Sequence, residues 1–225
     1  MSDGPALNGQ MFGDTSGSDG ESLPCTIQGQ LVRLRPIAKI DLPALFAWRN
    51  DGSWPIPFAR RSDRVTLGGL QASDRVLDFD TWCQTELPFV LQSGVAFLSE
   101  LSPQRLPLGV LLTHTFSDIH GWAYYREFFP GRLWQSMQAV EATALCLDYL
   151  FSRYPLRKLY TEVLVCDEGP LEKLKYAGFQ EEIRLEEDIW FGESFRDYVY
   201  LGLFREEWAE RRTSYLADLA SRPSS

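Results

Sequence analysis

The sequence lacks the features that would place the chain in a membrane or on nucleic acid. No run of apolar residues in its 225 residues approaches the ~20 that a membrane-spanning helix needs. Acidic residues number 31 against 22 basic ones, and a net charge of −9 would repel the phosphates of nucleic acid. Residues 1–20 are acidic and rich in Gly and Ser, which is typical of neither a secretory signal nor a transit peptide. We therefore expect a cytoplasmic protein that binds neither membranes nor nucleic acid.

Residues that bind metals or act as strong nucleophiles are scarce. A zinc site would need closely spaced Cys and His pairs, and the only two histidines, His114 and His120, fall in one predicted hairpin. The four cysteines are scattered: Cys25, Cys83, Cys146 and Cys166. We expect them to be reduced and packed as small hydrophobic residues, with no metal site. The sequence also has no Gly-x-Ser-x-Gly elbow and no Gly-x-x-x-x-Gly-Lys-Ser/Thr loop, which excludes the usual serine hydrolase and nucleotide triphosphatase signatures.

What is present indicates one globular domain. The chain is 44% hydrophobic and 24% charged, and its length is enough to bury a substantial core. We predict a disordered acidic tail over residues 1–26, a folded domain over residues 27–220 and a short tail over residues 221–225.

Hydrophobic patterning predicts a mixed α/β fold. The predicted strands cover residues 31–36, 90–100, 106–115, 122–128, 158–165, 179–190 and 195–203. The predicted helices cover residues 42–48, 74–87, 139–151, 171–177 and 205–219, with Asp41 as an N-cap for the first and Gly178 after the fourth. The helix over residues 139–151 is apolar on most of its circumference, so we expect it to be buried against the sheet. A meander combined with strand–helix–strand crossovers predicts a mostly antiparallel mixed sheet flanked by helices.

Four stretches of sequence, in a fixed order, carry a likeness to a known family. Leu31-Val-Arg-Leu-Arg-Pro-Ile leads into Asp41-Leu-Pro-Ala-Leu-Phe-Ala-Trp-Arg-Asn, and the other two stretches are Leu174-Lys-Tyr-Ala-Gly-Phe-Gln-Glu-Glu and Trp190-Phe-Gly-Glu-Ser-Phe-Arg-Asp-Tyr. With the order of elements, they resemble the GCN5-related N-acetyltransferase (GNAT) superfamily over about residues 30–208. Within it, they resemble the Rim-like branch of ribosomal-protein N-terminal acetyltransferases.

The resemblance implies where an acyl-CoA donor would bind. In the family, a strand ends in a Gly-rich turn whose backbone N–H groups hold the CoA pyrophosphate at a helix amino terminus. The pattern Trp-Gly-x-Gly-x-Ala-x-Glu-Ala falls on residues 134–142 here, with both glycines replaced, by Gln135 and Met137. The implied donor-binding residues are Arg132, Gln135, Ser136, Met137, Gln138, Ala139 and, after the next strand, Asp167.

Further along the chain, this sequence departs from the family again. Asp167 stands where the family has an Asn, Pro170 where it has a Ser, and Leu174 where it often has a Tyr that protonates the leaving thiolate. All of these departures fall on the donor side. They leave open two alternatives to acyl-CoA: a thioester carried on the pantetheine arm of a carrier protein, or a binding module that no longer transfers acyl groups.

Acyl transfer to an amine needs a base and donors for the oxyanion, and several side chains are candidates. The resemblance places the base at Glu127, with a strand-end charge or a partner of Arg126 as alternatives. Tyr124 and Tyr125 are neighbours on a predicted strand, so their side chains point to opposite faces of the sheet. One of them should point into the cleft, unless both serve packing. His114 could act as a base or be structural.

Two further groups have both a functional and a plainly structural interpretation. The basic cluster Arg60, Arg61 and Arg64, in a predicted irregular loop over residues 51–73, could face an acidic acceptor or the CoA phosphate, or lie in solvent. Glu141 is expected to serve packing or the electrostatics of the helix start. The sequence thus predicts an N-acyltransferase, acetyl by default, whose acceptor is a small-molecule amine or a protein amino terminus.

Overall fold

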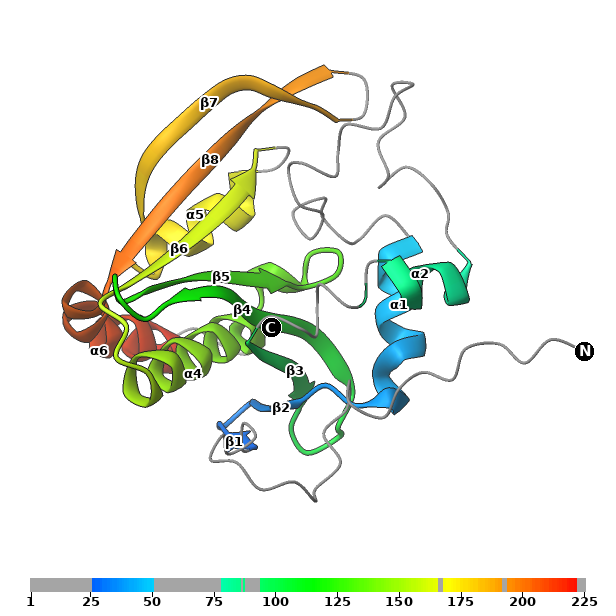
Figure 1. The fold of residues 1–225 in the computed structure, drawn as a ribbon. Coiled ribbons are helices and arrows are strands. Elements are labelled where there is room, and N and C mark those ends of the chain that lie inside the picture. The colour runs from blue at the N-terminus through cyan, green and yellow to red at the C-terminus, as the bar shows by residue number, and fades with distance from the viewer. Residues whose placement is uncertain are drawn as a thin grey trace, which may run out of the picture.

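The protein folds around one eight-stranded sheet (Figure 1). The computed structural model describes residues 26–50, 78–85, 87, 94–165, 168–191 and 194–221. Its strands are β1 (Ile27–Gln28), β2 (Val32–Pro36), β3 (Val95–Leu101), β4 (Pro107–Ser117), β5 (Trp122–Phe128), β6 (Lys158–Leu164), β7 (Gln180–Phe191) and β8 (Ser194–Phe204). Its α-helices are α1 (Leu42–Asn50), α2 (Phe79–Thr85), α4 (Met137–Arg153), α5 (Glu168–Tyr176) and α6 (Arg205–Ser221), with short 3-10 turns η2 (Lys39–Asp41) and η6 (Leu133–Gln135).

The strand order is β1-β2-β3-β4-β5-β6-β8-β7. Every neighbouring pair is antiparallel except β5 and β6, which run parallel. A parallel pair needs a crossover connection, and α4 supplies it. The predicted fold class, a mixed and mostly antiparallel sheet flanked by helices, is confirmed.

The main core lies on the face of the sheet that α4, α5 and α6 cover. α4 contributes buried residues from several sides, including Ala139, Ala142, Cys146 and Leu147, which confirms that most of its circumference is enclosed. From α6, Trp208 and Tyr215 pack into the same cluster. The Trp208 indole also donates a hydrogen bond to Asp148 of α4, at 3.0 Å. We call this side of the sheet the helix face.

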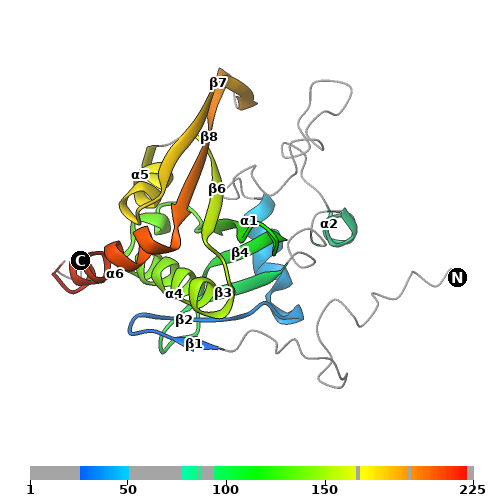
Figure 2. The same cartoon turned by 60° about the vertical axis from the view of Figure 1, so that its left-hand side comes forward.

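A second core lies on the opposite face, over β3 and β4. Leu42 and Leu45 of α1 and Trp82 of α2 are among the residues that pack there, against strand residues such as Leu98 and Leu112. Figure 2 shows α1 and α4 on opposite sides of these strands. α1 and α2 therefore lie mainly over the part of this face that β3 and β4 form.

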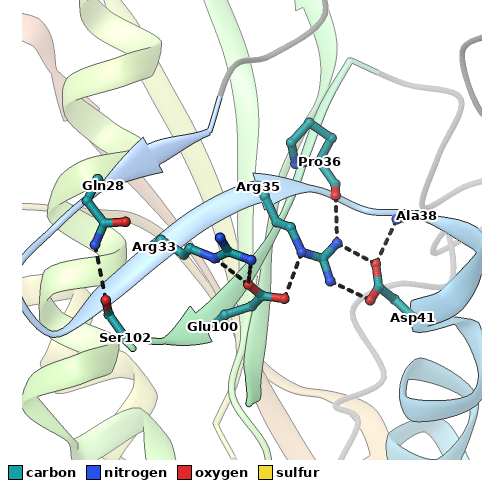
Figure 3. A network of polar contacts seen from close by, with 8 residues as sticks. All are labelled: Gln28, Arg33, Arg35, Pro36, Ala38, Asp41, Glu100 and Ser102. Atoms are coloured by element: carbon teal, nitrogen blue, oxygen red, sulfur yellow. Dashed lines mark hydrogen bonds and ion pairs between the residues drawn. The ribbon is translucent and has the colours of Figure 1, made fainter. Parts of the chain in front are cut away.

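A polar network fixes α1 to the edge of the sheet (Figure 3). Arg33 and Arg35 on β2 both bind the buried Glu100 carboxylate of β3, at 2.5 and 2.7 Å. Arg35 also pairs with Asp41 at 2.6 Å. The Asp41 carboxylate accepts the Ala38 backbone N–H at 2.7 Å, so it turns back toward η2 although its position just before α1 suggested an N-cap.

The element boundaries differ from the predicted ones where side chains or tight turns set them. α4 begins at Met137, two residues before the predicted start, because Ser136 caps it. α5 begins at Glu168 rather than residue 171. α2 begins at Phe79, later than the predicted start at residue 74, and residues 74–77 and 86 of the predicted helix lie outside the described residues. Gly178 follows α5 with a φ of +105°, a conformation that favours glycine, as predicted. The predicted loop over residues 51–73 lies outside the described residues.

Candidate functional site

The two halves of the sheet separate at the parallel pair. β5 and β6 share three residue pairs, Trp122↔Lys158, Ala123↔Leu159 and Tyr124↔Tyr160. Beyond them β5 continues alongside β4 to Phe128, while β6 continues alongside β8 to Leu164. The strands thus diverge between residues 125–128 and residues 161–164. We call this divergence the splay.

An ion pair crosses the splay on the face opposite α4. Arg126 of β5 donates to the Glu162 carboxylate of β6 at 3.0 Å, and the Tyr198 hydroxyl of β8 donates to the same oxygen at 2.5 Å. Both members of the ion pair are mostly buried, with 12% and 14% of their side chains exposed. This pair holds a carboxylate at the point where the strands part.

A second network lies on the helix face, joins the end of β5 to α4 and α5, and contains the predicted base. Glu127 accepts hydrogen bonds from the hydroxyls of Tyr125 and Thr143, both at 2.6 Å, and from Lys173 Nζ of α5 at 2.8 Å. Lys173 also lies 4.3 Å over the Phe129 ring. Burial lowers the pKa of Lys173, although the Glu127 carboxylate opposes this shift. Glu127 is therefore a buried partner of Lys173, neither an exposed strand-end charge nor a partner of Arg126.

Tyr124 and Tyr125 face opposite sides, as the sequence predicts. Tyr125 is fully buried and stacks on Phe179, with centroids 6.0 Å apart; burial, followed by the charge of Glu127, raises its pKa. Tyr124 is half-buried on the face opposite α4 and stacks on His114 with centroids 5.4 Å apart and rings 8° from parallel. Tyr124 is thus the one of the two that shares a face with the Arg126–Glu162 pair.

The predicted donor-binding residues gather at the amino end of α4. Ser136 is the N-cap, and its hydroxyl accepts the Ala139 N–H at 3.1 Å. Because Ser136 Oγ already satisfies the Ala139 N–H, the first-turn N–H groups of Met137 and Gln138 remain the better donors for a phosphate. Arg132 and Gln135 are exposed beside this turn. Asp167 lies outside the described residues.

An indole fixes this turn to α5, a contact that the sequence did not predict. A Cβ atom on Gly169 would lie 1.6 Å from the Trp134 ring, so the ring packs directly on the α5 backbone. Only glycine lacks the atom that would prevent this approach. Trp134 therefore ties the α4 turn to the helix that also carries Lys173.

Glu141, the acid of the family pattern, clamps the start of the sheet. Its carboxylate accepts three backbone N–H groups, from Gln30 and Leu31 at 2.7 Å and from Val32 at 2.8 Å. The residue is buried within the first two turns of α4. These contacts give it a structural task at the start of β2, which the expected packing or helix-start electrostatics did not include.

From the sequence, Arg126 was named only as an alternative partner of Glu127. Glu162, Tyr198 and Lys173 were not singled out. Strand alternation could have placed Glu162 on one face with Tyr160, but its partners come from other strands and from no local pattern. In the described parts of the chain, no group of three or more His, Cys, Asp and Glu side chains is arranged to hold a metal ion. The helices described there include none of the length and hydropathy that crossing a membrane requires.

Among the comparisons with known proteins, solved structures identify the fold. No protein-family model matches the chain, and no curated protein matches it. Among solved structures, a GCN5-related N-acetyltransferase from Brucella melitensis aligns with a TM-score of 0.64 at 18% identity, covering 88% of this chain and 86% of that one. Spermidine N-acetyltransferase from Vibrio cholerae, in complex with CoA and spermine, aligns with a TM-score of 0.63 at 18% identity, covering 80% and 98%.

A GNAT-family acetyltransferase from Bacillus anthracis aligns with a TM-score of 0.60 at 14% identity, covering 81% of this chain and 99% of that one. In each alignment the likeness spans at least four fifths of both chains. The chain therefore has the fold of the GCN5-related N-acetyltransferases.

Proposed function

We propose that this protein is an N-acyltransferase that moves an acyl group, acetyl by default, from acyl-CoA to an amine. The observation that carries this proposal is the splay, which opens between β5 and β6 beside the amino end of α4. A strand gap and a helix amino terminus at one place offer a path for an extended thioester and a binding site for its phosphates.

On the donor side, the backbone N–H groups of Met137 and Gln138 and the exposed Arg132 side chain would bind the pyrophosphate. Gln135, Ser136 and Ala139 would shape the turn, with the Ser136 cap holding the first turn of α4 in place of the missing glycines. Asp167, predicted from the resemblance, would contact the donor arm. A Vibrio cholerae protein of this fold has been solved with CoA, which supports a CoA ester as donor.

The acceptor would approach from the face that carries Tyr124 and Glu162. Its nitrogen attacks the thioester carbonyl carbon, the C–S bond breaks, the nitrogen loses a proton and the CoA thiolate gains one. Backbone N–H groups of β5 at the splay would stabilise the oxyanion. We assign proton removal to Glu162, through water, because it lies on the acceptor face. Glu127 lies on the helix face, where it is paired with the buried Lys173, so it would position β5 instead.

Calorimetric titration with acetyl-CoA tests the donor half of the proposal. Micromolar affinity is expected, with a loss of about tenfold in Arg132→Ala, because one phosphate contact is removed. The matched control is Arg153→Ala at the other end of α4, which should bind as the wild type does. Absence of acetyl-CoA binding would contradict the proposal. A signal with pantetheine-loaded carrier protein would then favour the carrier-protein donor, and no signal with either would favour a binding module.

Variant kinetics test the assignment of the base. Glu162→Gln should lower kcat by 10²-fold or more with little change in KM for acetyl-CoA, since a general base contributes about 10²–10⁴-fold. Glu127→Gln should instead reduce stability and affect both constants together. A larger loss of kcat in a folded Glu127→Gln than in Glu162→Gln would return the base to Glu127. The same assay on protein amino termini tests the Rim-like branch suggested by the sequence.

A further inference from the structure

Aromatic rings from three neighbouring strands form a continuous row on the acceptor face. His114 of β4 stacks on Tyr124 of β5, and Tyr124 lies 5.7 Å from Tyr160 of β6 between ring centroids. Trp122 closes the group, at 5.7 Å from Tyr124 and 5.9 Å from Tyr160, both nearly edge-on. We call these four residues the aromatic row. Along β5 the row leads directly to Arg126, which binds Glu162 at the splay.

The aromatic row keeps part of its surface open. Its four members are half-buried, unlike the fully buried Tyr125 on the other face. The helical cover of this side, α1 and α2, packs over β3 and β4, and Trp48 of α1 reaches β5 only at Phe128, at 5.8 Å between ring centroids. The row thus lies next to the splay, beyond the part of the face that α1 and α2 cover.

The charged groups beside the row are already neutralised within the protein. Glu162 is bound by Arg126 and Tyr198, and Glu182 of β7 is bound by Lys158 over Gly202. Each carboxylate is therefore paired with a cation of this chain. A polyamine, which is bound through several carboxylates or through open ring faces, would have to displace these partners.

The ring faces are also occupied from within. His114 covers one face of Tyr124, and the Lys158 ammonium lies 4.6 Å from the centroid of Tyr160. Side chains stand roughly perpendicular to a sheet, so the stacked rings of His114 and Tyr124, 8° from parallel, present their edges outward. Ring edges carry partial positive charge, which attracts the negative face of another aromatic ring and disfavours a cation.

We propose that the acceptor is an amine carried on an aryl group, which lies face-down across the edges of the aromatic row while its nitrogen reaches the splay. The inference rests on the proposed acyl transfer and names its acceptor class. It separates this protein from polyamine acetylation, although a spermidine N-acetyltransferase shares its fold. Tyr160, at the β6 end of the row next to the splay, is then a specificity residue.

The test compares three amines with the full chain and acetyl-CoA, measuring thiol release. 2-Phenylethylamine and 2-cyclohexylethylamine have the same amine and nearly the same bulk, and differ in the aromatic ring; spermidine supplies the polycation. We expect kcat/KM to be about tenfold higher for 2-phenylethylamine than for either other amine, because only the aryl group gains edge-to-face contacts with the row. Equal rates for the two matched amines, or a preference for spermidine, would overturn the inference.

A matched pair of variants tests whether the preference for the aryl amine arises from the aromatic row. Tyr160→Phe keeps the ring and should keep the preference, whereas Tyr160→Leu should reduce it to about twofold or less. Acetyl-CoA affinity and the thermal melting temperature, measured on both, show whether each variant is folded. A tenfold preference that persists in a folded Tyr160→Leu would contradict the role of the row.

Direct binding measurements distinguish a failure of this inference from a failure of the proposed function. Calorimetry on the protein saturated with CoA, or on the free protein if CoA does not bind, compares 2-phenylethylamine with 2-cyclohexylethylamine without any turnover. Preferential binding of the aryl amine without acyl transfer would sustain the acceptor site and reject the proposed reaction. Acetyl transfer to other amines without aryl preference would support the proposed reaction and reject the aryl-amine acceptor site.

Discussion

Single side chains in this protein join segments that are far apart in the sequence. Glu141 is the clearest example, because one carboxylate accepts three consecutive backbone N–H groups of the turn between β1 and β2. Such bonds to a charged acceptor are stronger than neutral ones, and their loss would leave the buried Val32 N–H unsatisfied. The amino-terminal strands therefore depend on a residue more than 100 positions further along the chain.

Glu141→Gln should lower the free energy of unfolding by about 2–3 kcal/mol, since the amide is uncharged and offers one oxygen to three donors. Urea denaturation measures the change. Glu172→Gln, at a side chain that is 68% exposed, is the matched control and should change stability by less than about 0.5 kcal/mol. Equal effects of the two substitutions would show that the Glu141 hydrogen bonds contribute nothing to the free energy of unfolding.

The Gly169 contact gives a prediction that a double-mutant cycle can isolate. Gly169→Ala should expel the Trp134 ring, which is seen as a red-shifted and quenched indole emission together with a loss of acetyl-CoA affinity. Trp134→Ala removes the indole and with it the clash. Gly169→Ala should therefore lower acetyl-CoA affinity much less in a Trp134→Ala background. Additive effects in the cycle would contradict direct packing of the ring on Gly169.

Lys173 and Glu127 form a buried pair whose partners depend on each other. Lys173→Met leaves the Glu127 carboxylate without its cation, and breaking a buried pair in this way costs about 3–5 kcal/mol. The double variant Glu127→Gln/Lys173→Met should recover part of that loss, because no buried charge remains. A double variant that is less stable than Lys173→Met alone would refute the pairing.

At the scale of elements, the β7–β8 hairpin is bent at a bulge that polar contacts hold. The register shifts between Leu185 and Ile189, where Glu187 has a φ of +49°. Asp197 accepts the Glu187 N–H at 3.1 Å and pairs with Arg184 at 2.8 Å. The backbone bond, followed by the Arg184 charge, lowers the pKa of Asp197.

This pKa shift predicts how the hairpin responds to acid. A carboxyl group whose pKa is lower in the folded than in the unfolded state stabilises the fold above its unfolded pKa, about 3.9. That contribution is lost as the pH falls through the lower folded value. Wild type should therefore exceed Asp197→Asn in stability at pH 6, and the difference should shrink below about pH 4 in urea denaturation. A difference that stays constant down to pH 2.5 would contradict the assignment.

Local patterns predicted most elements, and long-range contacts explain the exceptions. The strand over residues 122–128 was predicted at its observed limits, because period-two alternation and a hairpin turn define it. β1 was missed because two residues carry no period, and Glu141 holds them in place from α4. The turn before α4 contains η6, which depends on Trp134 meeting Gly169.

The candidate site was less predictable than the fold. Residues around α4 could be chosen by their sequence position, and the structure places them at one helix end. The Arg126–Glu162–Tyr198 contact joins three strands, so it exists only once the sheet is assembled. Glu127 could be assigned to the end of β5, but its partner Lys173 on α5 could not be read from the sequence.

At the scale of the whole molecule, Arg205 closes the domain. Its guanidinium donates to the backbone carbonyls of Leu156 at 2.7 Å and Tyr154 at 2.8 Å, and to that of Phe151 at the end of α4. The planar guanidinium of Arg205, the first residue of α6, thereby binds the last turn of α4. Beyond this junction, α6 packs its buried Trp208 and Tyr215 into the main core.

Arg205→Lys should reduce the free energy of unfolding by about 2 kcal/mol, because an ammonium cannot reproduce the three fixed directions. Arg211→Lys, an exposed position on the same helix with one backbone contact, is the control and should cost less than about 0.5 kcal/mol. Chemical denaturation followed by tryptophan fluorescence measures both. Indistinguishable variants would mean that the Arg205 guanidinium does not stabilise the junction.

The short parallel pairing between β5 and β6 has a mechanical consequence. The sheet consists of two antiparallel leaves, β1–β5 and β6–β8–β7, that share a spine of three residue pairs. A change in their opening angle would have to break the Arg126–Glu162 pair and repack the helix-face core, where Tyr125 of β5 stacks on Phe179, while every antiparallel ladder stays intact. Amide exchange should be fastest along the facing edges of the two leaves beyond the spine, and slow within each leaf. The width available to an acyl chain would then be set by this angle rather than by the side chains of a rigid pocket.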